Sequence, residues 1–480
     1  MPIVAAFMLP HPPIILSEIG RGEEEKIALT RQSYERVADE IAELAPETII
    51  ISSPHTVMYG DYFHISPGEG AEGDMSAFNA GEVKFREKYD TELVEAITAE
   101  ALSYSDKADE EKEDFDVFPA GTLGEKDKKL DHGTMIPLYF IRQKYNDFKI
   151  VRIGLSGLPL STHYEMGKLI KKAVEKTGRR VVYIGSGDLS HKMKAEGPYG
   201  YAAEGPLYDE RIMKVCSSAN FGELFDFDEN FLDRAAECGH RSFLMMAGAL
   251  DGLSVKAEEL SHEATFGVGY GICRFEIGEA DEERHFLKKW REVRKQKIME
   301  KRNKEDAYVR LARFSLESFI RKGVQVKQKD IDERLMNELP SEIFSDKAGA
   351  FVSIHKEGLL RGCIGTIMPT CECLADEIMQ NAISAAVKDP RFPKIRENEL
   401  PLLEINVDVL GEPEPIDGPD MLDVKKYGVI VTAGYRRGLL LPDLEGVDTV
   451  EQQIEIACNK AGIGIYEDYS LERFEVVRHI

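Results

Sequence analysis

Short runs of apolar residues alternate with longer segments of mixed polarity through the first 277 residues of the chain. The short runs are rich in β-branched residues and bounded by glycine and proline, which predicts buried strands. They cover residues 2–9, 48–53, 149–155 and 181–184. In the longer segments apolar residues recur every three or four positions, which predicts amphipathic helices. These cover residues 23–44, 90–102, 135–145 and 164–176.

Strands that alternate with helices in this way are typical of an α/β fold. Right-handed connections between them predict a largely parallel or mixed sheet with helices on both faces. Two further extended runs, 255–260 and 266–275, close the unit. The polar, glycine-rich segment 59–79 predicts a long loop, and Thr162-x-x-Glu165 predicts a capping box at the start of the following helix.

A change of pattern separates this unit from the second half of the chain. Residues 279–306 are almost wholly charged, so we interpret them as an exposed helical linker. The sequence therefore predicts a first domain at 1–277, a linker at 278–305 and a second domain at 306–480. In the second domain strands and helices do not alternate strictly, which favours an α+β fold with a mostly antiparallel sheet.

Charge and composition exclude several classes of function. The net charge of −25 disfavours nucleic acid as a partner, because phosphate binding needs a basic face. The basic cluster 288–297 in the linker is either a docking site for nucleic acid or an acidic partner, or a solvated helix face. No apolar run is long enough to cross a membrane, and we recognise no signal peptide. Seven cysteines, an odd number, do not form a disulfide framework, so we expect a cytoplasmic protein.

Histidines follow three of the predicted strands. His11 lies in a proline-rich turn after the first strand, His55 follows the second, and His191 ends the segment Gly185-Ser-Gly-Asp-Leu-Ser-His191 after the fourth. In an open α/β sheet the carboxyl ends of the strands form the edge where ligands bind. The sequence therefore predicts that these histidines gather at one edge of the sheet.

Two histidines and one carboxylate form the facial triad of non-haem Fe(II) oxygenases. His11 and His55 supply the imidazoles, and Glu237 is the best carboxylate candidate, because it precedes an apolar helical segment where a buried acid needs a cation. His132 and His191 then remain near the same edge as acid–base groups. Any one of these histidines could be structural, but their shared setting favours a site.

Five motifs resemble, in the same order, those of the class III extradiol ring-cleavage dioxygenases, the LigB-like enzymes. They are Leu9-Pro-His-Pro-Pro13, Ser53-Pro-His55, Leu130-Asp-His-Gly-Thr134, Gly185-Ser-Gly-Asp-Leu-Ser-His191 and Glu237-Cys-Gly. The resemblance covers about residues 1–277. It implies Fe(II), or another divalent metal, held by His11, His55 and Glu237, with a small aromatic substrate such as a catechol and O2 beside it.

The resemblance also implies roles for four further residues. His191 would be the acid–base group that handles the catechol proton, and His132 would line the pocket and assist proton transfer. Asp188, counted with them as catalytic, and Asp131, a candidate behind the metal ligands, would hold the histidines in a fixed orientation through hydrogen bonds.

Neighbouring residues leave a second metal chemistry open. His240 lies three residues after Glu237 and would share its helix face, where it could contact the ligand or bind the metal itself. Cys238 is adjacent, and the Memo family, which shares this fold, uses a cysteine in this region. A non-oxygenase metal site therefore stays an alternative. His262 either lines the substrate entrance or lies on the surface.

One motif in the second domain carries chemistry, Leu360-Arg-Gly-Cys-Ile-Gly-Thr366. Gly362 and Gly365 bracket Cys363 and allow a close backbone approach. Arg361 could lower the pKa of the cysteine and favour the thiolate. Cys363 is then either a nucleophilic or redox group, or a small buried cysteine in a turn.

This motif and several later segments resemble the AMMECR family over about residues 306–480. The whole chain is similar to the AmmeMemoRadiSam system protein A family with a dioxygenase-like domain in front. That likeness implies association with a Memo-type protein and a radical SAM enzyme, and an oligomer is compatible with the sequence. We predict an Fe(II)-dependent oxidoreductase of the extradiol dioxygenase type. The alternatives are a Memo-like metal-binding scaffold and a component of a radical SAM-associated modification pathway.

Overall fold

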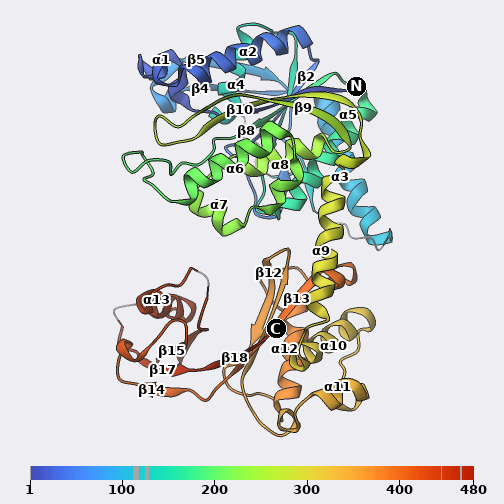
Figure 1. Cartoon of the computed structure of the whole chain (residues 1–480), viewed down its shortest axis with the longest axis vertical. Helices are drawn as coiled ribbons and strands as arrows, with labels where there is room; N and C mark the ends of the chain where they lie inside the picture. The colour runs from blue at the N-terminus through green and yellow to red at the C-terminus, as the bar shows by residue number, and fades with distance from the viewer. Residues whose placement is uncertain (1, 112–117, 125–128, 445, 465–466) are drawn as a thin grey trace. The chain divides into compact units, whose positions relative to one another are not determined.

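A computed structural model describes residues 2–111, 118–124, 129–444, 446–464 and 467–480 of the chain (Figure 1). The chain divides into two compact units, Met1–Glu292 and Val293–Ile480. Within the described residues, no helix combines the length and the apolar character that a membrane crossing requires.

The first unit is built on a six-stranded sheet with the order β7-β2-β8-β1-β10-β9. Its strands are β1 (Ile3–Leu9), β2 (Thr48–Ser53), β7 (Lys149–Gly154), β8 (Val181–Ser186), β9 (Leu253–Glu263) and β10 (Tyr270–Ala280). The first four in the order are mutually parallel, β10 runs antiparallel to β1, and β9 runs antiparallel to β10. The predicted α/β fold with a largely parallel, mixed sheet is confirmed.

Helices cover both faces of this sheet (Figure 1). They are α1 (Ser17–Gly20), α2 (Ala28–Leu44), α3 (Thr91–Glu111), α4 (His132–Arg142), α5 (Leu160–Thr177), α6 (Glu204–Ser218), α7 (Glu229–Ala235) and α8 (His240–Ala249). Alternate residues of β1 point to opposite faces. Phe7 packs with α2 and α4 in one core, whereas Met8 packs with α5 and α8 in the other.

The segment 59–79 is more ordered than the predicted loop. It contains β3 (Phe63–His64) and β4 (Gly70–Met75), which pair with β6 (Ala120–Gly121) and β5 (Ala80–Lys88). Most residues of β4 are partly or fully exposed, so the strand lacks the apolar alternation that identifies a strand in a sequence. The predicted capping box is also wrong, because Thr162 and Glu165 lie inside α5, which begins at Leu160 after Pro159.

The boundary between the two units falls inside α9 (Phe286–Arg302), the helix predicted for the charged segment. Its first turns are less exposed than predicted. Leu287 is fully buried, and the ring of Trp290 lies 5.1 Å from that of Phe225. Apolar side chains at these positions anchor the start of α9 to the first unit.

The second unit contains two antiparallel sheets with the orders β12-β11-β13-β18 and β14-β17-β15-β16. The strands are β11 (Ala350–Lys356), β12 (Leu359–Gly365), β13 (Leu403–Leu410), β14 (Glu414–Ile416), β15 (Gly428–Ala433), β16 (Arg436–Leu440), β17 (Ser470–Phe474) and β18 (Val476–His479). The helices are α10 (Ala307–Lys322), α11 (Glu333–Glu338), α12 (Leu374–Val387) and α13 (Val450–Ala461). The predicted α+β fold is confirmed.

Candidate metal centre

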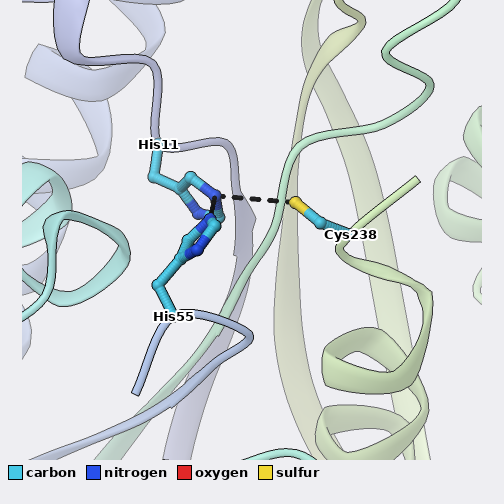
Figure 2. Close-up of side chains that lie close together, drawn as sticks. All are labelled: His11, His55 and Cys238. Atoms are coloured by element: carbon cyan, nitrogen blue, oxygen red, sulfur yellow. Dashed lines mark hydrogen bonds between the residues drawn. The ribbon is translucent and has the colours of Figure 1, made fainter. Parts of the chain in front are cut away.

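Three side chains meet where the parallel strands end. His11 follows β1 and His55 follows β2, while Cys238 lies in the turn between α7 and α8. Figure 2 shows the two imidazoles and the thiol directed toward one another. Among the described residues, these three form the group whose metal-ligating atoms all lie within 4.8 Å of one another.

The spacing of the three atoms fits a single metal ion. The two Nε2 atoms of His11 and His55 lie 3.0 Å apart, and Cys238 Sγ lies 3.6 Å from His11 Nε2. Metal–nitrogen bonds of about 2.1 Å and metal–sulfur bonds of about 2.3 Å place such donors about 3.0–3.6 Å apart at angles between 90° and tetrahedral. Two imidazoles and a thiolate suit iron, zinc or copper.

A close backbone approach brings Cys238 to the histidines. Gly187, directly after β8, packs against Gly239, and a Cβ added at Gly187 would lie 2.1 Å from the Cα of Gly239. The backbone N–H of Asp188 donates a hydrogen bond to Cys238 Sγ at 3.2 Å. Glycine is therefore required at this position, and the contact holds the thiol beside the end of β8.

The ring of His11 is oriented for metal binding through Nε2. Ser186 Oγ donates a hydrogen bond to the carbonyl of Gly133 at 2.6 Å and lies 2.9 Å from His11 Nδ1. The Ser186 hydroxyl proton is taken up by the Gly133 carbonyl, so Ser186 Oγ can only accept a hydrogen bond from the Nδ1–H of His11. With its proton on Nδ1, the His11 ring directs the lone pair of Nε2 at His55 and Cys238. Sequence analysis missed Ser186; its place between two glycines at a strand end is the signal that marks it.

Burial makes the centre electrically neutral before a cation binds. Burial and the neighbouring histidines lower the pKa of His11 well below its usual value, and burial lowers the pKa of His132 to about 4. Burial also raises the pKa of the Cys238 thiol well above its usual value. Neutral imidazoles are the metal-binding form, and a bound cation would displace the thiol proton.

Glu237 and His240 point elsewhere. Glu237 Oε2 accepts a hydrogen bond of 2.5 Å from the backbone N–H of His240, the first residue of α8. The His240 ring lies with Nε2 3.0 Å from the carbonyl of Leu224 and Nδ1 3.3 Å from the Tyr208 hydroxyl. Among the described residues Glu237 is thus not a member of the three-atom group. Its predicted role as a metal ligand stays a prediction.

The two predicted orienting carboxylates contact backbone and hydroxyl groups. Asp188 Oδ1 accepts from the backbone N–H of His11 at 2.7 Å, and burial raises the pKa of Asp188 to about 7. Asp131 caps α4 by accepting from the N–H of Thr134 at 3.0 Å and from Ser53 Oγ at 2.7 Å. This cap fixes the start of α4 and with it His132, whose ring centroid lies 4.0 Å from that of His55, with the two ring planes tilted by 33°.

A cavity of about 850 Å³ lies beside the three-atom group. His55, His132, Asp188 and His191 contribute to its lining, together with the aromatic residues Phe78, Tyr199, Phe266 and Tyr270. None of these aromatic residues belongs to a recognisable motif, so the sequence did not reveal them. The His191 ring donates through Nδ1 to the carbonyl of Ala236, which leaves its Nε2 able to accept a proton.

His262 lies in β9 and pairs with a buried carboxylate. Its Nε2 is 2.9 Å from Asp209 Oδ2, and the other oxygen of Asp209 accepts from the backbone N–H of Ser190 at 2.9 Å. The hydrogen bond to Asp209 raises the pKa of His262. The pair therefore supports the segment that carries His191.

The family described as the catalytic LigB subunit of aromatic ring-opening dioxygenase matches residues 5–273, more than half of the chain. The chain belongs to the LigB family. A second family, AMMECR1, matches residues 309–479. These matches confirm the predicted combination of a LigB domain with a following AMMECR1 domain.

Three proteins similar to the whole chain or to part of it are the following. A protein of Clostridium acetobutylicum is 41% identical over 473 residues, which cover 98% of each chain. A protein of Thermotoga maritima is 49% identical over 177 residues, which cover 36% of this chain and 98% of its own. A crystal structure of an uncharacterized protein from Pyrococcus horikoshii is 32% identical, covers 36% of this chain and 88% of its own, and has a TM-score of 0.32.

In the AMMECR1 domain the predicted motif forms strand β12 rather than a turn. Arg361 binds Glu399 with two hydrogen bonds, of 2.9 and 3.0 Å, and the carbonyl of Pro393 with a third. A Cβ at Gly362 would lie 2.3 Å from the carbonyl oxygen of Ala385, and one at Gly365 would lie 2.2 Å from the Phe351 ring. The glycines therefore allow β12 to pack closely, and Arg361 has an ion-pair partner of its own.

Asp389 is expected to stabilise the AMMECR1 domain in a pH-dependent way. Hydrogen bonds from Arg391 lower the pKa of Asp389 from 3.8 to about 2. Because the folded-state pKa is depressed, the stabilisation is fully present above about pH 4 and is lost as the pH falls through 2. Asp389→Asn should therefore cost about 2 kcal/mol at pH 6 and about 1 kcal/mol at pH 3. Calorimetry of the full chain at both pH values measures this, and an equal cost at both would contradict it.

Proposed function

We propose that the LigB domain is a metal-dependent oxidoreductase of the ring-opening dioxygenase type, acting on a catechol or a related small aromatic diol with O2. Fe(II), or another divalent metal, would be held by His11, His55 and Cys238. One observation carries the proposal: three donor atoms at the spacing of a metal site lie beside a cavity lined by two further histidines and four aromatic rings.

The cavity offers the groups that such a substrate needs. Aromatic rings bind a flat aromatic compound by stacking and by excluding water. His191 carries its proton on Nδ1 and presents a free Nε2, so it can take a proton from a phenolic hydroxyl. Burial lowers the pKa of both His132 and His191, which keeps both rings in the neutral, proton-accepting form at pH 7. A bound iron would polarise the diol and activate O2.

The thiol in the centre favours a second candidate. Class III dioxygenases resemble this chain but imply a carboxylate ligand, whereas the third donor beside His11 and His55 is Cys238. A thiolate selects softer metals and a different redox range. The domain would then be a Memo-like metal-binding scaffold without ring cleavage, serving a radical SAM-associated modification pathway together with the AMMECR1 domain.

Metal loading and turnover separate the two candidates. The full chain is reconstituted anaerobically with Fe(II), its iron is counted, and a panel of catechols is followed in air for the yellow ring-opened product. One iron per chain with a yellow product supports the dioxygenase. One iron without turnover on any catechol favours the scaffold, and failure to bind any divalent metal would overturn both.

Ser186→Ala tests the orientation of His11. Loss of the acceptor for Nδ1–H frees the ring to rotate and to change tautomer, so metal affinity should fall about 10- to 100-fold. Competition with a chromophoric chelator measures the Kd. Ser52→Ala is the matched control, because Ser52 is an equally buried serine in the adjacent β2 and its hydroxyl pairs with Ser242. Equal effects of both variants would mean that Ser186 acts only through stability.

A further inference from the structure

Cys363 lies in the middle of β12, opposite Ser353 of β11. The Ser353 hydroxyl donates to Cys363 Sγ at 3.3 Å. Four of the seven cysteines are buried, and Cys363 is one of the three that are only partly covered. The residue is therefore partly exposed to solvent, and its sulfur already accepts a hydrogen bond.

An ion pair surrounds the backbone of Cys363. Its N–H donates to Asp389 Oδ2 at 2.9 Å, and its carbonyl accepts from Arg391 Nη2 at 3.2 Å. Arg391 also binds both oxygens of Asp389, at 3.0 and 2.7 Å. More than half of the Arg391 side chain is nevertheless exposed. The ion pair fixes the arginine beside the cysteine and leaves the guanidinium open to a ligand.

A second cation lies within electrostatic reach of the same thiol. Lys460 belongs to the last turn of α13, and its ammonium is close enough to interact electrostatically with both Cys363 and Arg391. Partial burial lowers the pKa of Lys460. Asp389 neutralises one of the two positive charges, so Asp389, Arg391 and Lys460 together carry one net positive charge.

We propose that Cys363 is a reactive thiol in a second active site, which binds small electrophiles that carry a carboxylate or phosphate group. Arg391 and Lys460 hold the anionic group while the Cys363 sulfur forms a bond to the electrophilic carbon. The bond from that carbon to its leaving group breaks, the leaving group keeps the electron pair, and the thiol proton passes to solvent. This site lies in the AMMECR1 domain and is independent of the metal centre.

Two alkylating agents of the same size test the proposal. Iodoacetate is an anion and iodoacetamide is neutral, and both transfer their two-carbon group to a thiolate with loss of iodide. The folded full chain is treated with an equimolar mixture, and mass spectrometry of its peptides gives the ratio of carboxymethyl to carbamidomethyl at each cysteine. Cys371 is the internal comparison, because it is also partly covered but adjoins the Glu377 carboxylate.

We expect the ratio at Cys363 to exceed that at Cys371 by about tenfold, since one site attracts and the other repels an anion. Lys460→Gln should lower the ratio at Cys363 by about threefold or more and leave Cys371 unchanged. Lys425→Gln, at another exposed lysine of the same unit, is the matched control. Equal ratios at the two cysteines, or a Cys363 that reacts with neither reagent until the chain is unfolded, would overturn the proposal.

Discussion

Cys238→Ser is expected to lower the affinity of the LigB domain for a divalent metal by about 100- to 1,000-fold. Structural sites with four ligands bind zinc with a free energy of about 10–16 kcal/mol. The loss of one ligand therefore costs about 3–4 kcal/mol of binding free energy. Serine has nearly the same shape as cysteine, but its hydroxyl keeps its proton and supplies no anionic ligand. Equilibrium dialysis with Fe(II) and Zn(II), followed by metal counting, measures the loss. Cys371→Ser, a partly covered cysteine of the AMMECR1 domain, should bind metal like the unaltered chain.

Glu237→Gln, in contrast to Cys238→Ser, is expected to leave metal affinity nearly unchanged. The Glu237 carboxylate accepts from the N–H of His240 at the start of α8, and a glutamine carbonyl can accept the same hydrogen bond. Metal affinity should therefore change by less than about threefold, far less than the loss expected for Cys238→Ser. If Glu237→Gln loses the metal while Cys238→Ser keeps it, the ligand set implied by the resemblance to the dioxygenases is the correct one.

His191→Ala is expected to lower kcat/KM for ring cleavage by about 100- to 10,000-fold, the range that a positioned acid–base group contributes. His191 lines the cavity and presents a free Nε2 there. Burial lowers its pKa below 6.5, so the unaltered enzyme should lose activity only as the pH falls below that value, where the ring becomes protonated. Steady-state rates on a catechol that turns over, measured from pH 5 to 8, test both statements.

Two measurements separate this role from the alternatives. His191→Ala should retain one metal per chain; loss of the metal would show that His191 is a ligand. His262→Gln is the matched control. His262 contacts Asp209, whose other oxygen accepts from the backbone N–H of Ser190, so it acts on His191 only through these two hydrogen bonds. Its effect on kcat/KM should be several times smaller than that of His191→Ala.

Much of the fold follows directly from sequence pattern. The runs that became β1, β2, β7 and β8 are short, mostly apolar and buried except at Val4 and Lys149, because a parallel sheet covered on both faces admits few polar side chains. Since parallel strands end at one edge, the same pattern predicted that His11 and His55 would meet, and they do. The hairpin of β4 and β5 buries only scattered apolar residues, Ala71, Met75, Ala80 and Val83. They do not form a continuous apolar run, and the hairpin escaped detection.

Tertiary structure places Cys238, and not Glu237, beside the two histidines. Glu237 and Cys238 are neighbours in sequence, and the order of residues predicts both beside the histidines equally well. The chain direction at this point depends on Ala236, which ends α7 with a left-handed backbone (φ 52°), and on the contact of Gly187 with Gly239. Successive side chains leave the backbone in different directions, so this turn sends Cys238 Sγ to His11 and the Glu237 carboxylate to the start of α8. Sequence alone determined which strands deliver the imidazoles; only the packing of two distant turns decided which of the two neighbouring side chains lies beside them.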